Sequence, residues 1–188
     1  MTKATKRTRA LTGTAMLAAV ATILMYMEFP IPIMPGFIKM DISELPALIA
    51  SFAYGPLSGI AVCLIKNLIK LPSTSTAAVG ELFNFVMGAL FVGVAGIVYK
   101  KNKTRKGAII GAVAGALIMA LVSLPYNYFV VYPAYVVMYH LPLEAIIGMY
   151  QAINPNVNGL LACLVTFNVP FTFAKGMVDA LLCFLIYK

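Results

Sequence analysis

Long stretches without a charged side chain are the feature that most limits what this chain can fold into. Asp, Glu, Lys and Arg are all absent from residues 10–27, 45–65, 82–99, 107–143 and 145–174. About 18 consecutive apolar residues are enough to propose a transmembrane helix. Of the 188 residues, 62% are hydrophobic and 11% are charged, whereas a soluble domain carries about 25% charged residues. The sequence therefore predicts one all-α integral membrane domain over residues 1–188. It excludes a soluble enzyme, a disordered chain and a nucleic-acid-binding protein.

The positive charge of the chain is concentrated in short segments. The formal net charge is +8, and most of the cations precede residue 10, fall within 100–106 or end the chain at Lys188. Short basic loops mark the cytoplasmic side of a membrane protein. We therefore expect both termini and the 100–106 loop to be cytoplasmic, and we interpret the charge as a topology signal rather than a nucleic-acid-binding patch.

The number of helices depends on residues 45–71. Read as one helix, this segment would place the basic 100–106 loop outside. Gly55-Pro56 interrupts it, because proline lacks the backbone donor and disfavours helix in the residue before it. Two short helices, 45–54 and 56–71, restore the topology, and a hairpin that re-enters the same face would do so equally well. The full prediction is a six-helix bundle with helices at about 10–28, 45–54, 56–71, 80–100, 107–138 and 158–187.

The N-terminal helix also has features of a secretory signal, with a basic start, an apolar stretch and a possible cleavage site at Ala19-Val20-Ala21. We expect it to be the first transmembrane helix instead. Two loops on the outer side, 29–44 and 139–157, are rich in proline and bulky apolar residues. They are interpreted as lids over an external cavity, and the alternative is that they are loops dipping into the headgroup region.

Polar residues within the predicted spans gather toward the outer half. Such residues are unfavourable in a membrane and tend to be functional. They are Lys66, Asn67, Lys70, Glu81, Asn84, Asn127, Asn168, Thr172, Lys175 and Asp179. Thr172, Lys175 and Asp179 share one helix face by their spacing, so Lys175 either forms a structural ion pair with Asp179 or has a functional role. Lys66 and Lys70 either extend to the outer headgroups or contact a ligand.

Together these side chains predict an outward cavity with aromatic and Met walls. Asparagine presents a donor beside an acceptor, which suits the edge of a planar heterocycle or a polyhydroxylated chain. No P-loop, metal-binding motif or catalytic triad is found in the sequence. Cys63, Cys163 and Cys183 are expected to be free, buried thiols. No catalytic activity, cofactor or metal is therefore predicted.

Several segments resemble the substrate-binding S components of energy-coupling factor (ECF) vitamin transporters, specifically the riboflavin-specific ones. The resemblance covers nearly the whole chain and includes TAMLAAVATIL, the segment from Phe29 to Pro56, LIKNLI, VGELFNF, the Tyr-Asn-Tyr-Phe stretch and PFTFAKG. It implies a six-helix membrane subunit without enzymatic activity that captures riboflavin from outside. The implied partners are a transmembrane coupling subunit and two cytoplasmic ATPases.

The resemblance also implies functional positions. The residues implied to bind riboflavin are Met40, Glu81, Asn84, Asn127, Thr172 and Lys175. Ala15 and Ala19 are implied to dock the coupling subunit, and ordinary helix packing is their alternative role. Some family members carry asparagine at the position of Thr172, so the contact with the ring edge differs here, and Asn168 one turn earlier is a candidate to compensate.

Two other functions stay open at this point. The cations Lys39, Lys66 and Lys70 leave flavin mononucleotide (FMN) or another vitamin possible as the ligand, since a phosphate group seeks Lys or Arg. A membrane enzyme or a structural membrane assembly protein is the alternative from a different class.

Overall fold

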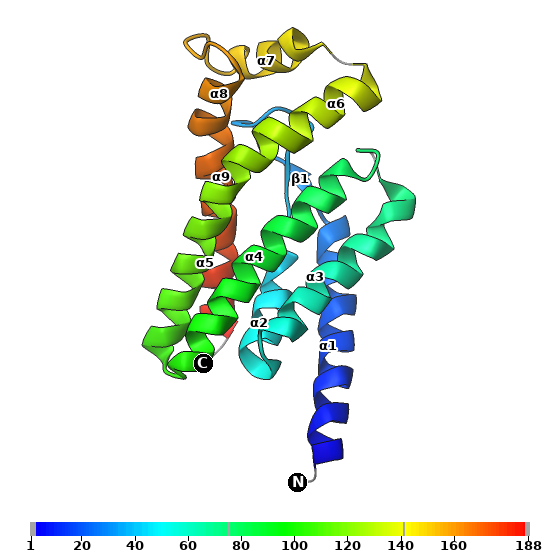
Figure 1. The fold of residues 1–188 in the computed structure, drawn as a ribbon, viewed down its shortest axis with the longest axis vertical. Coiled ribbons are helices and arrows are strands. Elements are labelled where there is room, and N and C mark those ends of the chain that lie inside the picture. Colours follow the sequence, from blue (N-terminus) through cyan, green and yellow to red (C-terminus); the bar gives the residue numbers. More distant parts are fainter. Residues whose placement is uncertain (1–2, 75, 141, 187–188) are drawn as a thin grey trace.

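The computed structural model describes residues 3–74, 76–140 and 142–186, and its chain is helical almost throughout (Figure 1). The elements in chain order are α1 (Lys3–Tyr26), β1 (Phe29–Pro30), β2 (Lys39–Met40), α2 (Glu44–Tyr54), α3 (Pro56–Lys70), η1 (Leu71–Ser73), α4 (Val79–Lys101), α5 (Arg105–Tyr126), η2 (Asn127–Val131), α6 (Tyr132–Tyr139), α7 (Leu143–Gln151), α8 (Leu160–Cys163), η3 (Leu164–Asn168) and α9 (Val169–Ile186). The first helix begins at Lys3 rather than near residue 10. Tyr187, predicted to end the last helix, and Lys188 lie outside the described residues.

Four helical segments of the described chain are long and apolar enough to cross a membrane. They are Ala4–Tyr26, Val79–Lys101, Arg105–Met138 and Leu160–Ile186. The third runs through α5, η2 and α6, and the fourth through α8, η3 and α9. In each, one π-helical stretch, η2 or η3, interrupts the α-helical hydrogen bonding. The prediction of an all-α membrane protein is thus confirmed, with a minimal two-stranded sheet added.

Helices α2 and α3 are too short to be among those four segments, with 11 and 15 residues. Gly55 separates them at φ 108°, a backbone conformation that favours glycine, and Pro56 opens α3. The predicted interruption at Gly55-Pro56 is therefore confirmed. The two helices fold back on each other, since a Cβ on Gly59 would lie 2.8 Å from the Ala47 carbonyl oxygen.

Small residues set the close approach of α4 and α5. A Cβ at Gly111 would lie 2.7 Å from the Ala95 carbonyl oxygen, and one at Gly115 would lie 2.5 Å from that of Phe91. The four-residue glycine spacing on α5 therefore lets the two backbones touch. Helix α9 packs on the other side of α5 and also against α2, and α1 packs on α2 and α3.

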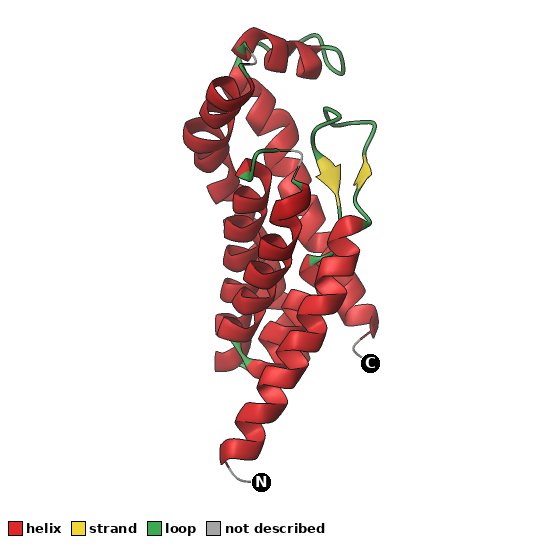
Figure 2. Ribbon diagram, turned by 90° about the vertical axis from the view of Figure 1, so that its right-hand side faces the viewer, coloured by secondary structure: helices red, strands yellow, loops and turns green. Residues whose placement is uncertain are grey.

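The proline-rich loop 29–44 forms a small antiparallel hairpin, with Phe29 opposite Met40 and Pro30 opposite Lys39. Figure 2 shows this hairpin at the end of the bundle opposite the start of α1. The α4–α5 connection and the end of α9 lie toward the same end as the start of α1 (Figure 1). The hairpin, α6 and α7 therefore mark one end of the molecule, called here the hairpin end.

Candidate functional site

A cavity lies at the hairpin end, between the hairpin and helices α2, α3, α4 and α9, with η2, α6 and η3 completing its wall. Five of the six predicted ligand-binding residues line it: Glu81, Asn84, Asn127, Thr172 and Lys175. Met40 is buried, at 8% exposed, but it is not among the lining residues. Its neighbours Lys39 and Asp41 are, as expected when successive strand residues point to opposite faces.

Lys175 of α9 lies between two carboxylates at the floor of the cavity. Its Nζ is 2.8 Å from Oδ2 of Asp41 and 3.2 Å from Oε2 of Glu44. The predicted Lys175–Asp179 pair is therefore wrong. Asp41 directly follows the hairpin and Glu44 begins α2. Tertiary packing therefore places both of these carboxylates against Lys175, and Asp179 of its own helix is not its partner.

Asp179 itself forms no ion pair with a lysine in the described part of the chain. It is completely buried, it lines the cavity, and neither carboxylate oxygen has a hydrogen-bond partner there.

Lys66 extends the ion-pair cluster beneath the cavity. Its Nζ is 2.7 Å from Oε1 of Glu44, and it also donates to the Ser43 hydroxyl. Lys66 is completely buried, so the interpretation that it extends to the headgroups is wrong. An unpaired charge in such a place would be strongly unfavourable, and the pairing with Glu44 is what permits its burial.

A second ion-pair group closes the cavity on the hairpin side. Lys39 Nζ donates to Glu28 Oε1 at 2.8 Å, and Lys70 pairs with the other oxygen of Glu28. Lys70 is only 8% exposed and also donates to the Met25 carbonyl oxygen at 3.2 Å. It therefore ties α3 to the end of α1 rather than reaching outward.

The two loop carboxylates are held ionised by these contacts. Burial by itself would raise the pKa of each, but Lys39 and Lys70 lower the pKa of Glu28 below its ordinary value. For Asp41, Lys175 and Lys66, with the Ser43 hydroxyl, overcome a stronger burial effect and hold the pKa well below its usual range. Both ends of the hairpin are thus fastened by charge to the helical bundle.

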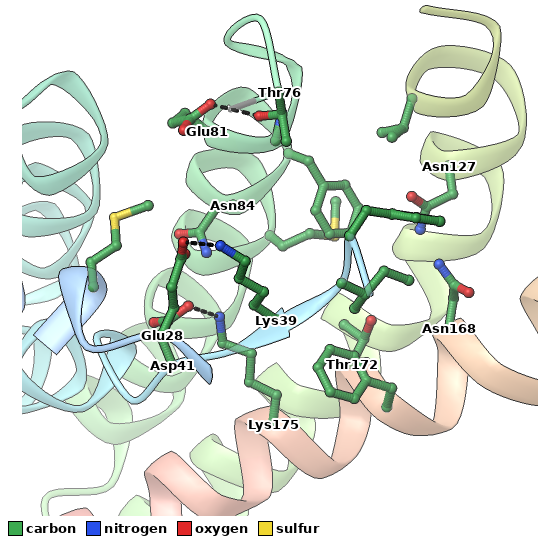
Figure 3. Close-up of a pocket in the computed structure, with 18 of the residues that line it drawn as sticks. Glu28, Lys39, Asp41, Thr76, Glu81, Asn84, Asn127, Asn168, Thr172 and Lys175 are labelled. Atoms are coloured by element: carbon green, nitrogen blue, oxygen red, sulfur yellow. Dashed lines mark hydrogen bonds and ion pairs between the residues drawn. The ribbon is translucent and has the colours of Figure 1, made fainter. Parts of the chain in front are cut away.

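The opposite end of the cavity is polar but uncharged. Asn127 of η2 and Asn168 of η3 face each other there, with Thr172 one turn beyond Asn168 (Figure 3). All three are buried, and Nδ2 of Asn127 has no partner among the described residues. Figure 3 also shows Glu28, Lys39, Asp41 and Lys175 grouped on the other side. The cavity therefore has a neutral amide end and a charged end.

Two further predicted residues lie along the α4 wall. Glu81 accepts from the hydroxyls of Thr74 and Thr76 at 2.7 Å and 3.0 Å. Asn84 accepts from Nδ2 of Asn67 at 3.3 Å. Both side chains are oriented by neighbours from the segment that precedes α4.

Aromatic and methionine side chains make up the apolar wall. Phe37, at the tip of the hairpin, lies edge-on to three tyrosines, with ring centroids 6.5 Å from Tyr132, 6.1 Å from Tyr135 and 6.3 Å from Tyr150. Met25, Met87 and Met119 line the cavity as well. Such a wall suits the face of a flat aromatic solute.

Sequence reasoning missed the charged partners and Phe37 as lining residues. Lys39, Asp41 and Glu44 were assigned to an outer loop and Glu28 to the end of the first helix. Four charges within 17 residues of an otherwise apolar, proline-rich segment are a signal that could have found them. The cysteines are free and buried, as predicted. In the part of the chain that the structure describes, no cluster of His, Cys, Asp or Glu could hold a metal ion.

Comparison with known proteins identifies this architecture. The family described as "ECF transporter, substrate-specific component" matches residues 9–187. The chain belongs to this family. It is therefore a multi-pass membrane transporter component and not an enzyme.

Individual relatives agree with this assignment of the S component. The riboflavin transporter RibU of Staphylococcus aureus is 33% identical over 93% of this chain and 86% of its own length. The riboflavin transporter FmnP of Bacillus subtilis is 34% identical over 92% of this chain and 87% of its own length. A solved structure titled as the S component of a bacterial ECF transporter superposes with a TM-score of 0.75 at 30% identity, covering 96% of this chain and 94% of that one.

The two alanines implied to dock a coupling subunit lie on the outside of α1. Ala15 and Ala19 are exposed, whereas Ala18 and Ala21 on the other face are buried. The role of ordinary packing inside the bundle therefore belongs to Ala18 and Ala21, and Ala15 and Ala19 are free to meet lipid or a partner.

Proposed function

We propose that this S component captures riboflavin in the cavity at the hairpin end. The observation that carries the proposal is the division of the cavity into an amide end and a charged end, joined by an aromatic and methionine wall. A flavin has the matching parts: a flat ring system with an edge of alternating C=O and N–H groups, and a chain of hydroxyls. The relatives named as riboflavin transporters support the same ligand.

In this proposal the ring enters between the hairpin and α4, with its polar edge toward Asn127 and Thr172. Glu81, Asn84 and Lys175 contact its other polar atoms or the hydroxyl chain. Met40 does not touch the ligand but supports the hairpin from behind. Because the hairpin covers the cavity, its apolar residues exclude water from the bound ring.

The proposal extends to topology and partners. Both termini and the basic 100–106 loop are cytoplasmic, the hairpin end faces outward, and α2 and α3 complete a six-helix bundle. The partners that membership of the ECF family implies are a transmembrane coupling subunit and two cytoplasmic ATPases, and the absence of a P-loop from this sequence is consistent with separate ATPases. Ala15 and Ala19 form part of the surface that meets the coupling subunit.

FMN is a second candidate ligand because of the ion-pair group at the cavity wall. Lys39 and Lys70 share the single carboxylate of Glu28, which leaves one positive charge in excess beside the site. A phosphate would be attracted there. Competition between FMN and riboflavin at low and high salt separates the two, since only the affinity for FMN should fall steeply as salt rises.

The deciding experiment is an absorption spectrum of the detergent-purified protein, with mass analysis of the molecule released on denaturation. We expect a flavin spectrum and released riboflavin, or quenching of added riboflavin fluorescence if the protein is purified empty. A colourless protein that does not quench riboflavin would refute riboflavin as the ligand.

A further inference from the structure

Three side chains at the amide end of the cavity, those of Asn168, Tyr132 and Tyr150, close a ring of hydrogen bonds. The Tyr150 hydroxyl donates to Oδ1 of Asn168 at 2.7 Å, and Nδ2 of Asn168 donates to the Tyr132 hydroxyl at 3.2 Å. The two tyrosine hydroxyls are also hydrogen-bonded to each other. Since the Tyr150 proton is used toward Asn168, Tyr132 donates to Tyr150. Each of the three groups therefore donates once and accepts once.

The ring holds the plane of the Asn168 amide. Reversing all three hydrogen bonds would flip the amide without breaking the ring, so the plane is fixed while either end can carry the oxygen. Each amide atom keeps one unused capacity, an N–H on the nitrogen and a lone pair on the oxygen. Asn168 lines the cavity and is 6% exposed.

The backbone places a second amide opposite the first. Asn127 begins the π-helical stretch η2, and Asn168 ends the π-helical stretch η3. Such insertions in a helix often occur at functional sites. Figure 3 shows the two side chains facing each other across the cavity end. Asn127 is 3% exposed, and its Nδ2, which has no partner among the residues that the structure describes, is a buried donor that needs an acceptor.

We propose that Asn168 binds the polar ring edge of the ligand together with Asn127, and that Tyr150 is a positioning residue that holds the Asn168 amide in plane. This proposal rests on the proposed function, because the edge that the two amides recognise is that of a flavin ring, in which an N–H lies between two carbonyl groups. Two amides at fixed positions offer donors and acceptors that match such an edge. Tyr150 itself is completely buried and is not a lining residue, so its effect on the ligand passes through Asn168.

The test compares two ligands, riboflavin and 3-methylriboflavin. In 3-methylriboflavin a methyl group replaces the hydrogen on the edge nitrogen, so this edge can no longer donate. The wild-type protein should prefer riboflavin. Tyr150→Phe should weaken riboflavin binding about tenfold, the loss of roughly one well-placed hydrogen bond, and leave 3-methylriboflavin binding nearly unchanged. Asn168→Leu should do the same. The double variant should be no weaker than the stronger single variant, since both changes remove one interaction.

Tyr128→Phe is the matched control, because it makes the same Tyr-to-Phe change next to Asn127 in η2. Tyr128 is 40% exposed and is not among the cavity-lining residues. It should bind both ligands like the wild type. Equal weakening of both ligands by Tyr150→Phe and by Asn168→Leu would overturn the proposal, because a purely structural role acts on both. A wild-type protein with no preference between the two ligands would also overturn it. If Tyr150→Phe fails to fold, Asn168→Leu alone decides by its preference between the ligands. Failure of the wild type to bind either ligand would instead refute the proposed function.

Discussion

Lys175 Nζ lies 2.8 Å from Oδ2 of Asp41, although 134 positions separate the two residues in the sequence. This contact fastens the end of the hairpin to α9 beneath the cavity. It links the covering of the site to the helix that carries Thr172 and Lys175. A change at either residue should therefore affect both the fold and the ligand.

Lys175→Met should lower stability as well as binding. It leaves Asp41 buried without its partner, and breaking a buried ion pair costs about 3–5 kcal/mol. We expect a clearly lower melting temperature in detergent and loss of flavin fluorescence quenching. Adding Asp41→Asn should restore much of the melting temperature, because Lys66 and Glu44 still balance each other. It should not restore binding if Lys175 contacts the ligand. Recovery of both properties in the double variant would assign Lys175 to the fold alone.

Asn127→Ala should weaken binding with little effect on stability. Nδ2 of Asn127 has no partner in the described part of the chain, so its removal breaks no side-chain hydrogen bond of that nitrogen. A lost hydrogen bond to the ligand corresponds to about 1–3 kcal/mol, or roughly a tenfold to hundredfold higher Kd in a fluorescence titration. Asn158→Ala, an exposed change in the loop after α7, is the control and should leave the Kd unchanged. An unchanged Kd for Asn127→Ala would contradict the assigned amide end.

Phe37→Ala should speed the release of the ligand. The Phe37 ring lies edge-on to three tyrosines, and each such aromatic pair contributes about 0.5–1.5 kcal/mol beyond its buried area. Removing it loosens the hairpin tip, so we expect the dissociation rate in a stopped-flow chase to rise about tenfold or more. Phe29→Ala changes an exposed phenylalanine of the same hairpin and should release the ligand at the wild-type rate. Equal rates for both variants would show that the hairpin tip does not hold the ligand in.

Ala15→Trp combined with Ala19→Trp should abolish uptake by cells that contain the complete transporter. Both alanines are exposed on α1, so the added rings would obstruct a partner without disturbing the core. Flavin binding by the isolated subunit should stay at the wild-type level. Leu121→Trp, at a site 67% exposed on α5, adds bulk on another outer face and should leave uptake intact. If the alanine variant loses binding as well, α1 packing rather than docking explains the effect.

Local patterns in the sequence were sufficient for much of the fold. The uncharged stretches determine the long spans because charged side chains are unfavourable inside a membrane. These spans are helical because a helix satisfies its own backbone hydrogen bonds there. Gly55-Pro56 determines the break between α2 and α3 because the backbone conformation there favours glycine and proline cannot continue the preceding helix. The spacing of glycines on α5 determines where another backbone can approach. Each of these features depends on residues close together in the chain.

The partners of the buried charges were decided only by tertiary structure. Helical spacing placed Asp179 beside Lys175, yet Lys175 pairs with Asp41 and Glu44, because burial selects the carboxylates that packing brings closest and spacing on one helix does not reveal them. The π-helical stretches that turn Asn127 and Asn168 toward each other have no sequence signal of comparable strength. The sequence by itself determined that polar groups would meet at one end of a membrane bundle. Which of them are paired, and which are left free for a ligand, depended on contacts between different elements, up to the 134 positions that separate Lys175 from Asp41.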